Sequence, residues 1–276
     1  MTDLLKDVID AHGGMNKWRG VRAIDLRFNF SGAVLEIKGF PRHLQPSCSI
    51  DVREGRVVFQ RLGGHPDDRW IFTGDRCWIE RRDGSVLESR DRPREGYAGH
   101  AFETKWDALH LTYFIGYAIW NYVSIPFLLA GPGFVVRETE GHEENGEHWR
   151  VLDVTFPEGF HAHTREQKFY FGPDLMLRRI DYVTDVVGGV AAHYCFDHRQ
   201  YDGIMFPTLR RVVSRRDDGA KVTGRTGFLL DYVDLRCVDN LDTGAETGLD
   251  TARRTSRRFV RHPPAPRARA EIARVR

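Results

Sequence analysis

A short stretch between residues 100 and 121 holds the densest group of side chains that could do chemistry. Asp107 lies three residues before His110, so on a helix its carboxylate can approach the imidazole, fix the tautomer and raise its basicity. In an apolar pocket such a pair can act as a general acid or base, and Tyr113 or Tyr117 can donate a second proton. The candidate catalytic residues are Asp107, His110 and Tyr117, with His100 as an assisting group.

The same stretch carries an aromatic stripe. Trp106, His110, Tyr113, Tyr117 and Trp120 recur at spacings of four, three, four and three, which places them on one helical face. They can instead be core packing, with the acid complementing the helix dipole and the histidine satisfied and buried. The mixture is more polar than a plain core and more aromatic than a surface, which indicates ligand lining. The predicted ligand-binding residues are Trp106, Tyr113, Phe114, Trp120 and Asn121.

The tripeptide 161–163, His-Ala-His, is a candidate metal site. Alternate residues of a strand point to the same side, so two imidazoles at this spacing can chelate a transition metal. His193 is the predicted third ligand, and His100 or Asp197 could take its place. The alternative is a polar mouth of the sheet that holds no metal. We therefore expect either no cofactor or a divalent metal bound by His161, His163 and His193.

Residues 111–130 form an uncharged, largely apolar segment of twenty residues, just long enough to cross a bilayer. Thr112, Asn121 and Ser124 reduce its apolarity, and Pro126 breaks the helix near its end. Polar groups inside a membrane are strongly disfavoured. The segment is therefore predicted to be a buried core helix and not a transmembrane span.

The segments on either side of this helix show the two-residue alternation of β-strands. Ile24, Leu26, Phe28 and Phe30 alternate with polar residues, and residues 33–38 are predicted to form the second strand of a hairpin. Later strands follow one another without helical crossovers, which indicates an antiparallel meander. With a short amphipathic helix over residues 2–11, the predicted fold is α+β, mainly β, built around the central apolar helix.

Composition and charge set the expected domain organisation. The chain has 276 residues and is 41% hydrophobic, which is enough to bury a sizeable core. Residues 252–276 hold nine arginines against the single acid Glu271, so this segment carries +8 and residues 1–251 carry −6 of the total +2. We expect one domain over 1–251 and a disordered Arg/Pro-rich tail over 252–276. We expect no nucleic-acid partner, because the acidic body continues no basic groove.

Compartment and reaction class are constrained mainly by missing signals. The N-terminal residues carry charges at Asp3, Lys6 and Asp7 and lack the apolar core of an export signal, so we expect a cytoplasmic protein. The four cysteines show no CxxC spacing and are expected to be free thiols. The sequence has no GxSxG nucleophile elbow, no phosphate-binding loop and no HExxH motif. The oligomeric state is left open.

The layout of the chain resembles the LolA/LppX-type lipoprotein-localisation superfamily. The resemblance lies in Ala11-His12-Gly13-Gly14 with Trp18 and Val21 before the first strand, the mid-chain apolar helix, and the turn at 169–175 that leads to residues 178–182. It implies a curved antiparallel sheet, a half-barrel, whose concave apolar face is plugged by helices and holds acyl chains. The lipobox cysteine is missing, so the chain resembles a soluble bacterial branch with a different task.

Two functions follow as hypotheses. The first is a soluble intracellular binding protein for a lipid-like or polyketide-like molecule held in an apolar cavity, which the apolar helix facing a sheet favours. The alternative is a cavity enzyme, a cyclase, isomerase or hydrolase, with Asp107 and His110 as its acid/base pair and a possible metal. The histidines and Asp107 must converge for the enzyme hypothesis to hold.

Overall fold

The computed structural model describes residues 1–216, 221 and 224–239, which belong to one compact unit, Met1–Asn240. The predicted tail over 252–276 and the end of the predicted domain, 240–251, lie outside the described residues. The helices are α1 (Asp3–Ala11), α2 (Met15–Trp18), α3 (Ala33–Lys38) and α4 (Ala108–Ser124), with 3-10 helices η1 (Pro93–Tyr97) and η2 (Phe127–Ala130).

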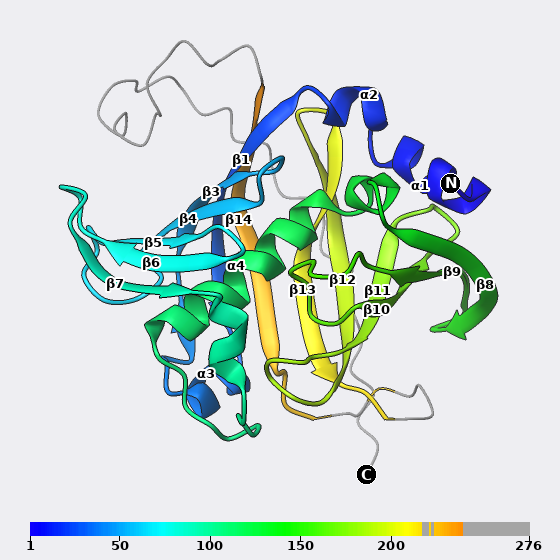
Figure 1. Cartoon of the computed structure of the whole chain (residues 1–276). Coiled ribbons are helices and arrows are strands. Elements are labelled where there is room, and N and C mark those ends of the chain that lie inside the picture. The colour runs from blue at the N-terminus through cyan, green and yellow to red at the C-terminus, as the bar shows by residue number, and fades with distance from the viewer. Residues whose placement is uncertain (217–220, 222–223, 240–276) are drawn as a thin grey trace, which may run out of the picture. The chain divides into compact units, whose positions relative to one another are not determined.

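Most of the unit is one large antiparallel sheet (Figure 1). Its order is β7-β6-β5-β4-β3-β1-β14-β13-β12-β11-β10-β9-β8, and β2 pairs with β1 beside this path. The strands are β1 (Val21–Ser31), β2 (His43–Leu44), β3 (Ser47–Asp51), β4 (Arg56–Gln60), β5 (Arg69–Phe72), β6 (Arg76–Glu80), β7 (Val86–Asp91), β8 (Val135–Glu144), β9 (Glu147–Thr155), β10 (Glu166–Phe171), β11 (Leu177–Val183), β12 (Val190–Tyr201), β13 (Ile204–Ser214) and β14 (Phe228–Asp239).

Strand β1 joins two meanders, because it pairs with β3 on one side and with β14 on the other. Every other neighbour along the main path is also the next strand in sequence. The mainly β class and the large, open, curved antiparallel sheet predicted from the sequence are therefore confirmed, and the arrangement is consistent with a half-barrel. Cross-strand register then decides which residues share a face.

Helix α4 lies across one face of the sheet (Figure 1) and contacts β4, β5, β6 and η1. Its first residue follows Asp107, whose extended backbone and side chain cap the helix, and Pro126 follows shortly after its end. Almost every side chain of the helix is buried. Among residues 1–216 and 224–239, no helix combines the length and the apolar character that a bilayer span requires.

The prediction of a strand over residues 33–38 is wrong, because this segment forms helix α3. Gly32 precedes the helix and Gly39 ends it in the left-handed conformation, so a glycine bounds the helix at each end. Ala33, Leu35 and Lys38 are good helix formers, and all three are buried. The alternation of apolar and polar residues was too short to distinguish the two structures.

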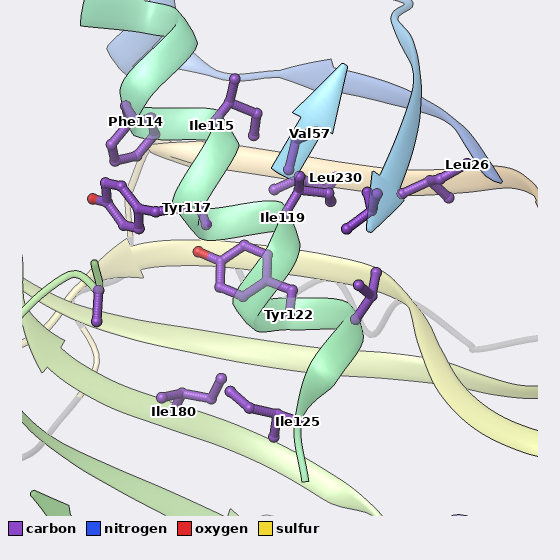
Figure 2. Packing of buried hydrophobic residues seen from close by; sticks show 14 of the residues in the cluster. Leu26, Val57, Phe114, Ile115, Tyr117, Ile119, Tyr122, Ile125, Ile180 and Leu230 are labelled. Atoms are coloured by element: carbon purple, nitrogen blue, oxygen red, sulfur yellow. The ribbon is translucent and has the colours of Figure 1, made fainter. Parts of the chain in front are cut away.

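The main core lies between α4 and the sheet face that it covers, here called the inner face. Ile180, His193, Val212 and Phe228 stand in register across β11 to β14 on this face. Figure 2 shows Ile119 of α4 directed toward Val57 and Leu230 from the two halves of the sheet. The helix therefore packs against strands of both meanders.

A smaller apolar cluster lies on the opposite face, with Trp149, Tyr170 and Tyr194 among its members. Between these rings Arg179 is almost fully buried, and its guanidinium forms two 2.6 Å hydrogen bonds with Asp181 and one of 2.8 Å with Glu144. A buried arginine needs such charged partners to offset its lost hydration. This network fixes the end of the β8–β9 hairpin against β11 and contributes nothing to the inner face.

Candidate functional site

Asp107 and His110, the predicted acid/base pair, form a capping box at the start of α4. The Asp107 carboxylate accepts the His110 backbone N–H at 2.9 Å, and His110 Nδ1 lies 3.2 Å from the Asp107 backbone N–H and 2.8 Å from its Oδ1. The other ring nitrogen, Nε2, donates to the Gly96 carbonyl at 3.0 Å. Nδ1 therefore completes the cap of α4, and Nε2 holds η1 against it.

Arg90 also binds Asp107, with its guanidinium 2.6 Å and 3.3 Å from the two carboxylate oxygens. Partial burial opposes ionisation, but the hydrogen bonds from Arg90 and from the His110 N–H outweigh it and lower the pKa of Asp107. Asp107 is therefore a stable carboxylate with all its partners in place. This geometry agrees with the structural alternative raised for the pair.

His100 and Trp106 lie beside this cap and do not reach the middle of the inner face. The His100 ring contacts Tyr97 and His110 at ring-centre distances of 5.5 Å and 4.9 Å. Burial is the main factor that lowers the pKa of His100. Trp106 packs on Phe114 at 5.1 Å, and the Lys38 ammonium lies 5.0 Å above the indole.

Tyr113 and His161 form a second polar contact, one turn farther along α4. The Tyr113 hydroxyl lies 3.0 Å from His161 Nδ1 and accepts a 3.2 Å hydrogen bond from Arg94, which in turn binds Asp185 at 2.6 Å. Asp75 lies 3.6 Å from His161 Nε2. Burial lowers the pKa of His161, with Asp75 acting in the opposite direction. Titratable groups converge here.

Trp120 and Asn121 hold the chain around this contact. Trp120 stacks on Phe160 with ring centres 5.1 Å apart and donates its indole N–H to the Val52 carbonyl at 3.3 Å. The Asn121 side chain donates to the His161 carbonyl at 3.0 Å. Both residues therefore fix the loop between β9 and β10 against α4.

His163 lies at the centre of a buried chain of hydrogen bonds. Its Nδ1 is 3.0 Å from the Tyr117 hydroxyl and its Nε2 is 2.6 Å from the Tyr122 hydroxyl. Figure 2 shows both phenol rings projecting from α4 away from Val57. Burial is the main factor that lowers the pKa of His163, to about 3, and the Arg94 charge acts in the same direction. The imidazole is therefore neutral at physiological pH.

This chain of hydrogen bonds, called the polar chain below, continues across the inner face to a buried arginine. Tyr122 and Tyr182 hydrogen-bond to each other, and the Tyr182 hydroxyl lies 3.4 Å from His193 Nδ1. Arg210 donates toward His193 Nε2 at 3.5 Å, so that nitrogen is an acceptor and Nδ1 carries the proton. Arg210 also donates to the Tyr122 carbonyl at 2.9 Å. A cation at one end thus orients the chain toward His163.

The predicted metal ligands do not converge. His161–Thr164 belongs to a loop and not to a strand, because β10 begins only at Glu166. His163 directs both of its nitrogens at tyrosine hydroxyls, and His193 directs one of its nitrogens at Arg210. Within the described part of the chain, no three His, Cys, Asp or Glu side chains are placed to hold a metal ion.

An apolar cavity of about 380 Å³ lies at the end of the inner face next to this chain. Helix α3, helix α4 and strands β11 to β14 contribute its walls, and exposed Gly188 and Gly189 lie at its mouth. The ring centres of His163 and Tyr182 stack at 4.2 Å, and both rings line the cavity. The lining residues are Val34, Phe102, Phe114, His163, Tyr182, Thr184, Val187, Gly188, Gly189, Val190, Ala191, Val212, Val213, Ser214, Gly227 and Phe228.

Two predicted site residues line this cavity: Phe114 from the ligand set and His163 from the metal set. The other predicted residues lie elsewhere along α4, in the neighbouring loops or on β12. A larger hollow of about 1020 Å³ beside α1, α2 and η2 has charged residues such as Lys6 and Arg53 among its lining and contains no predicted residue. Sequence reasoning missed Tyr182, Val212 and Phe228 as lining residues. The signal that could have found them is the alternation of apolar and polar residues along their strands.

Comparison with known proteins finds solved structures that are similar to this one. No protein-family model and no curated protein sequence matches the chain. The chain is similar to proteins of the LolA superfamily. A LolA superfamily protein from Nitrosomonas europaea is 9% identical, with 85% of this chain and 92% of that chain covered and a TM-score of 0.49.

Two further solved structures are similar over most of their length. A putative outer membrane lipoprotein-sorting protein domain from Vibrio parahaemolyticus is 11% identical, covers 89% and 93% of the two chains, and has a TM-score of 0.44. The Mycobacterium tuberculosis lipoprotein LppX is 10% identical, covers 87% and 100%, and has a TM-score of 0.30. These are the groups that the sequence layout resembles.

Proposed function

We propose that the protein binds a hydrophobic small molecule in the cavity between α4 and the inner face of the sheet. The observation that carries the proposal is the lining itself. Aromatic and aliphatic side chains form most of the wall, while Thr184, Ser214 and the edge of the polar chain supply a few hydrogen-bonding groups. Ligand sites typically combine an apolar wall with a small number of polar groups in this way.

The position of the cavity supports the same function. Phe102 is 38% exposed at the wall, and the turn between β11 and β12 forms the mouth, so a ligand can enter without unfolding of the core. Within the wall, Phe114 packs on Phe228 with ring centres 5.1 Å apart. The inner end is therefore rigid and the outer end is accessible.

The alternative enzyme would require the predicted pair to face this cavity. Asp107 and His110 are instead engaged in the helix cap, and neither lines the cavity. The Tyr113–His161 contact is the better grouping of titratable residues, but it lines none of the hollows described above. Binding is accordingly the function that the geometry favours.

The proposal is tested with Nile red, a neutral hydrophobic dye, added to the full-length protein. We expect saturable binding at one site, and a weaker affinity by about tenfold or more in Ala191→Phe, because Ala191 is buried in the cavity wall and the ring would fill the space. Ala98→Phe adds the same ring at an exposed position outside the lining and should leave the affinity unchanged.

The two variants separate cavity binding from general stickiness. Circular dichroism must first show that both variants fold like the parent. Equal dye affinity in Ala191→Phe and the parent, or no saturable binding in the parent, would contradict the proposal. Native mass spectrometry of the same preparations reports any organic molecule that copurifies, and its mass then gives the natural ligand class.

A further inference from the structure

The lining of the cavity is uncharged throughout. Among the described residues that form its wall, none is Asp, Glu, Lys or Arg. Most lipid-like metabolites differ from one another at the head group, which is either ionised or neutral. Because a buried ionised carboxylate without a partner is strongly disfavoured, an uncharged lining discriminates between these two classes. This property goes beyond apolar binding but rests on the proposed function.

Two guanidiniums near the polar chain, those of Arg94 and Arg210, are already engaged or inaccessible. Arg94 does not line the cavity and forms a 2.6 Å ion pair with Asp185. Arg210 is 1% exposed and lies behind Tyr122 and His193, to which it is hydrogen-bonded. No carboxylate among the described residues pairs with Arg210, so an acidic head group could seek this cation. Reaching it would require displacement of two buried rings.

The imidazole in the wall adds no charge. His163 is hydrogen-bonded through both nitrogens to the hydroxyls of Tyr117 and Tyr122, and Tyr182 bonds to Tyr122 in turn. The pKa of His163 is lowered to about 3, so the ring stays neutral at physiological pH. The polar chain is thus neutral where it meets the cavity and largely satisfied within the protein.

We infer that the cavity selects uncharged amphiphiles, such as long-chain alcohols and esters, over the corresponding carboxylates. The groups left for a ligand are the hydroxyls of Thr184 and Ser214, which can bond a neutral hydroxyl or carbonyl. The stacked His163–Tyr182 pair and the ring of Phe228 provide flat walls for the apolar part.

The experiment compares dodecan-1-ol with dodecanoate as competitors of bound Nile red in the full-length protein. The two probes share one alkyl chain, and at neutral pH only the acid is ionised. We expect dodecan-1-ol to displace the dye at a concentration lower by about tenfold or more. Equal or better displacement by dodecanoate would overturn the inference and leave hydrophobic binding intact. If the dye binds but neither probe displaces it, the inference is overturned and hydrophobic binding stands. If no dye binds, the proposed function fails and the inference falls with it.

A pair of lysine substitutions tests whether the lining sets the selection. Val187 is buried in the cavity wall, whereas Val183, the last residue of β11 before the same turn, is 48% exposed and outside the lining. Val187→Lys should make dodecanoate the stronger competitor, because the ammonium supplies the missing partner, and Val183→Lys should keep the alcohol preference. A reversal in Val183→Lys as well would assign the selection to net charge and overturn the inference. Should Val187→Lys fail to fold, the comparison in the parent protein still decides.

Discussion

The hydroxyl oxygen of Tyr122 lies 2.6 Å from Nε2 of His163 in the protein core, where both side chains are buried. The contact joins α4 to the loop between β9 and β10, and the Tyr117 hydroxyl holds the other side of the same ring at 3.0 Å. Two hydroxyls five residues apart on one helix therefore fix an imidazole from a distant part of the chain. The contact positions one wall of the cavity.

Removal of the Tyr122 hydroxyl should destabilise the protein. In Tyr122→Phe, His163 Nε2 loses a buried partner, and an unpaired buried polar group costs about 1–3 kcal/mol. Chemical denaturation of the parent and the variant measures the difference in unfolding free energy. Tyr201→Phe is the matched control, because within the described residues the Tyr201 hydroxyl has no hydrogen-bond partner and its loss should change stability by less than about 0.5 kcal/mol. Equal effects of the two substitutions would show that the His163 contact is unimportant.

His163 should make the protein less stable in acid. Its pKa is about 3 in the folded protein and about 6.5 in an unfolded chain, so between these values the unfolded state binds more protons. Stability therefore falls as the pH drops below about 6.5, by at most about 1.4 kcal/mol per pH unit from this group. In His163→Gln this contribution is absent, so the stability difference between parent and variant should shrink as the pH falls toward 4. A pH-independent difference in denaturation curves would refute the assignment.

Part of this fold could be predicted because local patterns and tertiary structure agree. The alternation at Ile24, Leu26, Phe28 and Phe30 is that of β1, and all four side chains are buried. The uncharged segment after Asp107 has the composition of a buried helix, and α4 occupies most of it. In both cases the hydrophobic pattern of the sequence itself indicates whether one side or every side of the element is buried.

The cavity was hidden from sequence reasoning because its walls come from widely separated segments. Phe114, Tyr182 and Phe228 meet only through the strand order and register of the inner face. The histidines at 161 and 163 misled for a related reason, since the prediction that both point to one side required a strand, and residues 161–164 form a loop. On this loop each imidazole instead contacts a tyrosine hydroxyl of α4. His161 contacts Tyr113, and His163 contacts Tyr117 one helical turn further along.

Asp107 should behave as a helix cap and not as a catalytic carboxylate. Asp107→Ala removes the acceptor for the His110 N–H and the partner of Arg90, and loss of an N-cap costs about 0.5–2 kcal/mol. Asp107→Asn keeps a capping oxygen and should lose less stability. Denaturation measures both effects, and Nile red affinity should be unchanged in Asp107→Asn. A loss of dye affinity in a folded Asp107→Asn protein would place this carboxylate at the ligand site.

Gly116 allows α4 to approach β5 closely, and this makes a prediction opposite to helix propensity. Alanine is favoured over glycine inside a helix by about 1 kcal/mol, so propensity alone predicts that Gly116→Ala stabilises the protein. A methyl group at this position would lie 2.5 Å and 2.6 Å from two carbon atoms of Phe72, which is fully buried.

Neither the helix nor Phe72 can move freely, because the Phe72 ring also packs against Tyr113 and His161 with ring centres 5.8 Å and 6.0 Å away. Overpacking of a close-packed core costs about 1–3 kcal/mol, which exceeds the propensity gain. We therefore expect Gly116→Ala to lower the unfolding free energy in chemical denaturation. The double variant Gly116→Ala with Phe72→Leu should lose less than the sum of the two single changes, because the smaller side chain relieves the contact. A stabilised Gly116→Ala protein would mean that α4 can shift away from β5.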